Sequence, residues 1–129
     1  MTAPHQGSRD TFIEQTRWIP VRGQVDLDAT TATTVYTVPK NYYARVRVFF
    51  AERGGAAATV RLALRIDDDA DGTAESLANK HYLVYDAPLA ANEDMHTEEL
   101  WLGTDDVITA YASTGNVSVN VNGRRWPKQ

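Results

Sequence analysis

Hydrophobic and polar residues alternate along most of the chain, which is the pattern of β-strands with one buried face. The clearest segments are residues 44–50, 60–66 and 117–122. Further candidate strands lie at 80–86, 97–102 and 107–113, and two more precede residue 40. These strands, about eight in all, predict an all-β fold, a jelly-roll-like antiparallel β-sandwich with an extended N-terminal arm.

A short turn predicts how the first two clear strands pair. Gly54 and Gly55 can adopt the positive φ values that a tight hairpin requires, so we expect residues 44–50 and 60–66 to pair antiparallel. The apolar residues of one strand face should meet in the core: Val46, Val48, Phe50, Leu62, Leu64, Val119 and Val121. Helix is predicted only as one or two turns within residues 11–18 and 73–80.

The length of 129 residues predicts one domain, flanked by two tails. Residues 1–20 are polar with apolar residues that do not alternate, so we interpret them as an N-terminal arm. Residues 21–125 form the β-sandwich domain, and residues 126–129 form a C-terminal tail. The tails either fold back on their own sandwich or dock onto neighbouring subunits. We favour docking, because large apolar side chains are costly to leave in water: Phe12, Ile13, Trp18 and Trp126.

Composition and charge argue against several classes of protein. A net charge of −4 gives no general reason to bind nucleic acid or an anionic membrane. No apolar run approaches the roughly 20 residues of a membrane span, and the first residues lack the pattern of a signal peptide, so we expect synthesis in a cytoplasm. The absence of cysteine leaves no disulfide, thiolate zinc site or cysteine nucleophile.

No residue pattern points to catalysis. His5, His81 and His96 lack the spacing of metal ligands. Glu98 and Glu99 are adjacent, so on a strand they point to opposite faces and do not form an acid/base pair. We find neither a nucleophile elbow nor a phosphate loop. We therefore expect a protein that is not an enzyme.

Three segments resemble a known family. Read in order, "TTVYTVPKNYYARVRVFFAERGGAAATVRLAL", "HYLVYDAPLAANED" and "VITAYASTGNVSVNVNG" are similar to small β-sandwich virion proteins of tailed bacteriophages. The resemblance covers about Thr33 to Gly123. It implies a structural component of a phage particle at the head surface, the head-to-tail region or the tail. The chain departs from the family pattern in its long arm and in an acidic loop after residue 66.

That acidic loop begins like a calcium-binding loop. Calcium ligands at alternate positions would fall on Asp67, Asp69, Asp71 and Glu75, with Gly72 at the sharp turn. The closing position, which normally carries a bidentate carboxylate, is Ala78. A weak Ca²⁺ site and a solvated connection between strands both remain open, and the missing ligand favours the second. We expect no other cofactor.

The arginines of the predicted hairpin suggest a subunit contact. All lie on the polar side of their strands, so the predicted pairing would gather them into one basic patch: Arg45, Arg47, Arg61 and Arg65. The acidic residues gather elsewhere: Glu93, Asp94, Glu98, Glu99, Asp105 and Asp106. Opposite patches favour head-to-tail contacts in a homo-oligomer. The alternative is that these charges pair within one subunit or face water, where they contribute little.

Two functions fit these observations. The first is a non-enzymatic virion structural protein, a capsid decoration or cement subunit or a neck/tail-associated subunit. Its partners would be other virion proteins, major capsid or neck/tail proteins, and it would be made in the host cytoplasm. The second is a small receptor- or carbohydrate-binding module at the virion surface that uses Tyr42, Tyr43 or Tyr111. We prefer the first, because the tyrosines lie on strands that need them for packing.

Overall fold

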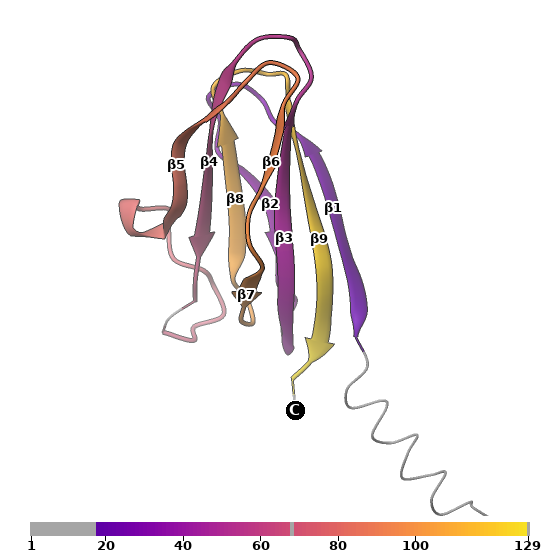
Figure 1. Cartoon of the computed structure of the whole chain (residues 1–129). Helices are drawn as coiled ribbons and strands as arrows, with labels where there is room; N and C mark the ends of the chain where they lie inside the picture. The colour runs from indigo at the N-terminus through magenta and orange to yellow at the C-terminus, as the bar shows by residue number, and fades with distance from the viewer. Residues whose placement is uncertain (1–17, 68, 129) are drawn as a thin grey trace, which may run out of the picture.

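The computed structural model describes residues 18–67 and 69–128, which form two stacked antiparallel sheets (Figure 1). The first, called here the β3 sheet, runs in the order β1 (Ile19–Asp26), β9 (Val117–Pro127), β3 (Tyr42–Glu52) and β6 (Asp94–His96), and β7 (Leu100–Leu102) also pairs with β3. The second, the β4 sheet, runs in the order β2 (Thr33–Thr37), β8 (Val107–Ala112), β4 (Ala58–Arg65) and β5 (Tyr82–Leu89). The predicted all-β antiparallel sandwich is confirmed, with nine strands in the described residues.

The first four strands alternate between the two sheets. β6 and β7 pair with β3 at different heights, where Phe50 faces Met95 and Arg45 faces Trp101. Counted as one interrupted strand, β6 and β7 leave four strand positions in each sheet. We interpret this order as jelly-roll-like.

The predicted hairpin between residues 44–50 and 60–66 is wrong. β3 pairs with β9, β6 and β7, whereas β4 pairs with β5 and β8, so the two strands lie in different sheets. Both strands carry an aliphatic face, and these faces oppose each other across the core instead of lying side by side. Residues 53–57 therefore cross from one sheet to the other.

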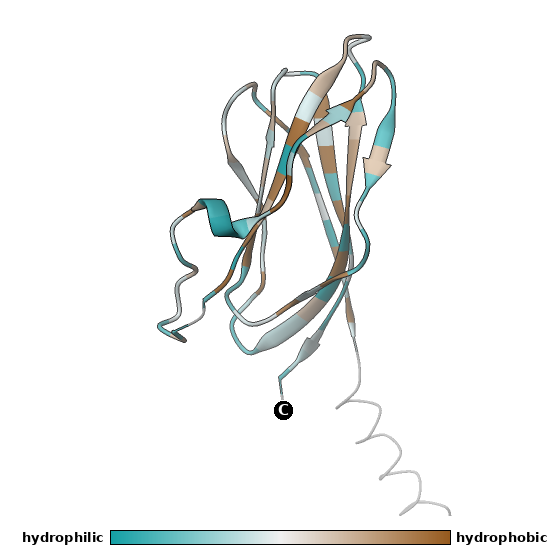
Figure 2. Cartoon of the chain, turned by 60° about the vertical axis from the view of Figure 1, so that its left-hand side comes forward, coloured by the Kyte–Doolittle hydropathy of each residue, from teal (hydrophilic) through white to brown (hydrophobic). Residues whose placement is uncertain are grey.

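The core lies between the two sheets and is built from the inward residues of their strands. In Figure 2 brown hydrophobic bands recur along the strands of both sheets. Six of the seven predicted core residues are buried: Val46, Val48, Phe50, Leu62, Val119 and Val121. The seventh, Leu64, is partly buried at the edge of the same cluster. The residues predicted to face inward on these strands therefore do face the core.

The segments outside the strands differ from prediction in detail. The described residues contain one helical segment, a 3-10 turn at Asn79–His81. The helix expected over 73–80 is therefore shorter than predicted. The segment expected at 11–18 lies almost entirely outside the described residues. β1 begins at Ile19, and β9 continues through Trp126 and Pro127, so strands extend into the segments assigned to the arm and the tail.

A buried carboxylate organises the crossing between the sheets. Glu52, at the end of β3, has no exposed surface. Its oxygens accept the N–H groups of Gly54 (2.7 Å), Gly55 (3.0 Å) and Asn92 (2.9 Å). The Asn92 hydrogen bond above all, with those of the two glycines, lowers the pKa of Glu52 against the opposing effect of burial. One side chain thus joins the loop after β3 to the loop between β5 and β6.

Because Leu62 and Leu64 are buried to different extents, replacing each by alanine should lower the free energy of unfolding by different amounts. Leu62→Ala should lower the free energy of unfolding by about 2–5 kcal/mol, because Leu62 is fully buried. Leu64→Ala should cost clearly less, because Leu64 is only partly buried. Urea denaturation of both variants measures the difference. A larger loss of unfolding free energy for Leu64→Ala than for Leu62→Ala would contradict the burial described here.

Glu52→Gln should weaken the fold and change its response to acid. At pH 7 we expect the melting temperature to fall by about 5 °C or more, because a neutral amide with one oxygen cannot satisfy three N–H donors. The lowered pKa of Glu52 means that its contribution is present above the unfolded value, about 4.3, and is lost as the pH falls through the folded value. The variant should therefore lose less stability than the wild type between pH 7 and pH 3.

Thermal melts at several pH values test this expectation. Glu93→Gln is the matched control, because the exposed Glu93 accepts a hydrogen bond from only one loop N–H, that of Ala90. Equal acid dependence in wild type and Glu52→Gln would show that Glu52 does not set the acid limit.

Candidate interaction surface

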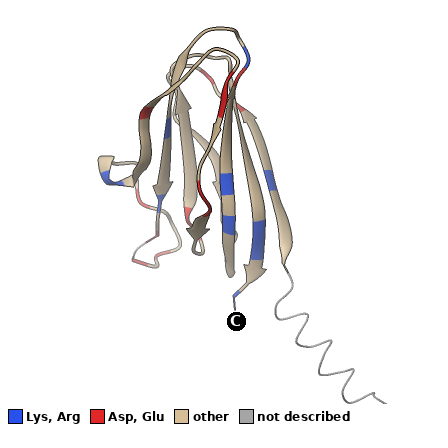
Figure 3. Cartoon of the chain, viewed as in Figure 1, with Lys and Arg blue, Asp and Glu red and all other residues tan. Residues whose placement is uncertain are grey.

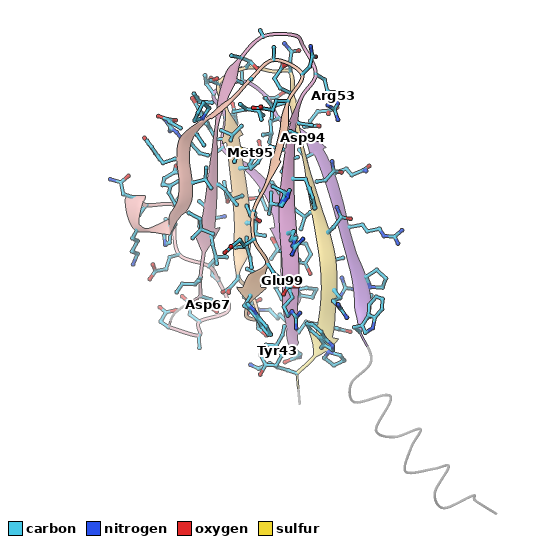
Figure 4. The ribbon with its side chains drawn as sticks, viewed as in Figure 1. Tyr43, Arg53, Asp67, Asp94, Met95 and Glu99 are labelled. Carbon is cyan, nitrogen blue, oxygen red and sulfur yellow. The ribbon has the colours of Figure 1, made fainter. Side chains whose placement is uncertain are left out.

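The outer face of the β3 sheet carries an arginine held between two tryptophans. The Arg45 guanidinium lies 4.4 Å from the ring centre of Trp101 on β7 and 5.6 Å from that of Trp126 on β9. Its Nη2 also forms an ion pair with Oε1 of Glu99, at 3.0 Å. These contacts follow from strand pairing, because β7 and β9 flank β3 and the outward side chains meet across the strands. Figure 4 shows Tyr43 and Glu99 toward the lower end of β3.

The same arrangement continues onto β9 and β1. The Arg124 guanidinium lies 5.4 Å from the ring centre of Trp18, which directly precedes β1. Together these outward residues form a surface that we call the Trp–Arg face: Trp18, Tyr43, Arg45, Trp101, Arg124 and Trp126. It contains all three tryptophans of the chain. In Figure 3 basic segments lie on β1, β3 and β9 of this sheet.

Much of the Trp–Arg face is open to solvent. Trp101 is 69% exposed, Trp18 48% and Tyr43 47%. A hollow of about 460 Å³ lies at the lower end of this face, lined by Tyr43, Arg45, Trp101, Leu102 and Trp126. Exposed aromatic surface of this extent beside a hollow is typical of a binding site and not of an inert sheet face.

The four predicted interface arginines do not form one patch, because β3 and β4 lie in different sheets. Arg45 and Arg47 point outward from the β3 sheet, and Arg61 and Arg65 point outward from the β4 sheet. This corrects the basic patch expected from the hairpin. Arg65 instead donates to the Thr109 hydroxyl at 3.3 Å and the Glu75 carbonyl at 3.1 Å.

Arg61 forms a second arginine–aromatic stack on the opposite face. Its guanidinium lies 4.2 Å from the ring centre of Tyr85 and 4.4 Å from that of Tyr111. The Asp86 carboxylate accepts from its Nε at 2.6 Å, and this hydrogen bond raises the pKa of Arg61 above its ordinary value. Tyr85 is 57% exposed. Each sheet therefore presents an arginine between two rings, paired with one carboxylate.

The acidic loop brings three of its four predicted ligands together. Carboxylate oxygens of Asp67, Asp69 and Asp71 lie within 4.8 Å of one another. Gly72 has φ +88°, and its N–H donates to Asp67 at 2.9 Å. Oxygens bound to one calcium ion at about 2.4 Å can lie up to about 4.8 Å apart, so the spacing fits this ion. The side chain of Glu75 is directed elsewhere, to Lys80 at 2.8 Å and His81 at 3.4 Å.

The carboxylates of this loop influence one another. Burial opposes ionisation of Asp67, but N–H groups of Gly72 and Asp71 donate to it and lower its pKa. The Asp71 N–H also donates to Asp69, but burial and the negative charges of Asp71 and Asp67 outweigh that bond and raise the pKa of Asp69. A cation would relieve this repulsion. The Lys40 ammonium, 3.4 Å from the Gly72 carbonyl, already lies beside the loop.

The interface role of the other predicted residues stays a prediction. Trp18 and Trp126 lie on the Trp–Arg face with Arg45, and Arg47 lines a neighbouring depression on the same sheet. Phe12 and Ile13 lie outside the described residues. The sequence analysis missed Trp101. Its signal was its position between Leu100 and Leu102 in a short alternating strand, which places the tryptophan on the outer side.

The fold resembles that of a chain in a phage capsid structure. No protein-family model and no curated protein matches the sequence. A chain in the acid-stable capsid structure of Helicobacter pylori bacteriophage KHP30 is 11% identical, with a TM-score of 0.50 over 89% of this chain and 91% of that chain. A chain of the cyanophage Pam1 capsid asymmetric unit is 14% identical, with a TM-score of 0.44 over 86% of this chain and 85% of that chain. At such identities the likeness concerns the fold alone.

Among the described residues, no helix is long and apolar enough to cross a bilayer.

Calorimetric titration of the acidic loop separates its two interpretations. If the loop is only a solvated connection, which the missing ligand at Ala78 favours, millimolar calcium should release no heat. If it is a weak site, binding heat should appear in the wild type and vanish in Asp69→Ala. Glu75→Gln should leave that heat unchanged, because the Glu75 side chain contacts Lys80 and His81 instead of the aspartates.

Proposed function

We propose that this chain is a non-enzymatic structural protein of a bacteriophage virion, a capsid decoration or cement subunit or a neck/tail-associated subunit. Two observations support a virion role. The sequence from about Thr33 to Gly123 resembles small β-sandwich virion proteins of tailed phages. The fold is shared with a chain of a phage capsid structure. In this proposal the protein is made in the host cytoplasm and works in the particle.

The observation that carries the assembly role is the exposed Trp–Arg face. Tryptophan, tyrosine and arginine are the residues enriched at the centres of protein interfaces. A cation–π contact at an exposed site contributes about 0.5–1 kcal/mol, and about 2 kcal/mol or more once it is desolvated. The stack of Arg45 between Trp101 and Trp126 would therefore strengthen when a partner covers it. Its geometry already exists in the isolated subunit, so little ordering is needed on binding.

The second stack, around Arg61, gives the subunit two distinct outer faces. A subunit that joins its neighbours needs more than one contact surface, and the two sheets point these surfaces in opposite directions. We propose other virion proteins as the partners, including major capsid or neck/tail proteins and further copies of this chain. Nucleic acid is not proposed, because the net charge is −4.

A receptor- or carbohydrate-binding role is the second candidate, favoured by the aromatic walls of the hollow. Of the three tyrosines considered for it, only Tyr43 borders the hollow. Tyr42 stacks under Arg125, and Tyr111 stacks under Arg61. Arg45 lies against the rings of Trp101 and Trp126, where a sugar would have to stack. The hollow thus suits a protein partner better than a glycan.

Quantification of this chain in purified phage particles tests the proposal. The wild-type chain should co-purify with the virion at a fixed copy number. Trp101→Ala should lower the bound copies by about tenfold or more, because an exposed tryptophan at the centre of an interface typically contributes 2 kcal/mol or more. The variant should remain folded, because Trp101 is 69% exposed in the free subunit.

Arg53→Ala is the matched control, since Arg53 is exposed and lies at the other end of β3 (Figure 4). Absence of the wild-type chain from particles would overturn the virion role. Full incorporation of Trp101→Ala would overturn the role of the Trp–Arg face. Glycan-array binding that Trp101→Ala abolishes would favour the second candidate.

A further inference from the structure

We propose that the hollow on the Trp–Arg face receives residues 10–14 of a second copy of this chain. The proposal rests on the proposed function, because it presupposes a subunit that assembles in several copies. The segment that would enter the hollow contains the two large apolar residues Phe12 and Ile13.

The hollow suits an apolar segment of a few residues. Aromatic rings of Tyr43, Trp101 and Trp126 form its walls, and the buried Leu102 contributes a further apolar side chain. Arg45, the remaining lining residue, already has Glu99 as its carboxylate partner. Its volume of about 460 Å³ falls in the range of pockets that enclose small ligands, roughly 300–1,000 Å³. Two adjoining large apolar side chains are an occupant of that size.

The surroundings of the hollow call for an occupant that carries negative charge. Arg124 and Arg47 point outward beside it, and neither forms an ion pair within the described part of the chain. Lys128 lies 6.0 Å from the ring centre of Tyr43, one of the wall residues. Cations gathered in this way on a chain of net charge −4 favour a partner that brings carboxylates.

The sequence "DTFIE" at residues 10–14 has this chemistry. Asp10 and Glu14 flank Phe12 and Ile13, so two carboxylates border two large apolar side chains. These residues lie outside the described part of the structure.

The attachment point of this segment lies beside the hollow. Ile19 pairs with Arg125, so Trp18 lies level with Trp126, one strand away, on the same face. Seventeen residues precede Trp18, and fully extended they could span about 56 Å, enough to reach another subunit.

The sequence favours a second copy over the same chain. To enter its own hollow the chain would have to reverse direction between Glu14 and Trp18. The residues there read "EQTRW" and include no glycine, proline, asparagine or aspartate, which are the residues that make tight turns. We therefore propose a second copy, and not the same chain, as the owner of the hollow that this segment enters.

Disulfide trapping tests this proposal directly, because the chain contains no cysteine of its own. Full-length Ile13→Cys, carrying a mass tag, is co-expressed with untagged Tyr43→Cys, and the mixture is mildly oxidised. A covalent heterodimer of tagged and untagged chains can form only between two molecules. We expect this heterodimer, and Trp101→Ala added to the Tyr43→Cys chain should reduce its yield about tenfold.

The control acceptor is Leu83→Cys, because Leu83 is 51% exposed, close to the 47% of Tyr43, but lies on β5 of the other sheet. It should trap at least about tenfold less heterodimer than Tyr43→Cys. Lys128→Cys provides a second acceptor beside the wall residue Tyr43, should Tyr43→Cys fail to fold as judged by circular dichroism.

Two results would overturn the inference. Equal trapping by Leu83→Cys would indicate random collision. An internal disulfide in the double variant Ile13→Cys/Tyr43→Cys, without heterodimer in the mixture, would show that the segment occupies its own hollow. Either result leaves the virion role intact if the chain co-purifies with particles, whereas absence from particles overturns the proposed function whatever the trapping shows.

Discussion

The pairing of β3 with β9 is the interaction on which the rest of this structure depends. The two strands are in register over the full eleven residues of each. Their inward valines supply the centre of the core, and their outward residues supply the middle of the Trp–Arg face. The pairing requires Gly123, because a Cβ there would collide with the backbone of Arg45 and Val46. One glycine thus permits both the core and the surface.

Each exposed arginine stack meets two opposing requirements. The free chain must keep its aromatic residues compatible with water, and the guanidinium groups of Arg45 and Arg61 lie over those rings while each remains ion-paired with a carboxylate. The proposed assembly role requires a shaped, partly apolar surface, and the same rings provide it. Because each arginine already has a carboxylate partner, covering the stack would not leave its charge unpaired.

Sequence periodicity predicted the strands far better than their partners. Alternation identified which residues of β3, β4 and β9 face inward, because a period of two is a local property. It could not show that β3 and β4 lie in different sheets, since a buried aliphatic face looks the same in either arrangement. The Gly54–Gly55 pair was misleading, because the buried carboxylate of Glu52 shapes that loop. The aspartate spacing of the acidic loop left open whether the three carboxylates converge, and the structure brings them together. The direction of the Glu75 side chain depended on Lys80 and His81, which no local pattern reveals.

Because all three tryptophans lie on one outer face, the intrinsic fluorescence of the chain reports on the surroundings of that face. In most domains tryptophan is largely buried, and its emission shifts to the red on unfolding. Here Trp18 and Trp101 are already exposed in the folded state, so intrinsic fluorescence should respond weakly to unfolding of the core. Burial of the face would instead move the emission to the blue. The emission wavelength of this protein should therefore change more when a partner covers the face than when the core unfolds.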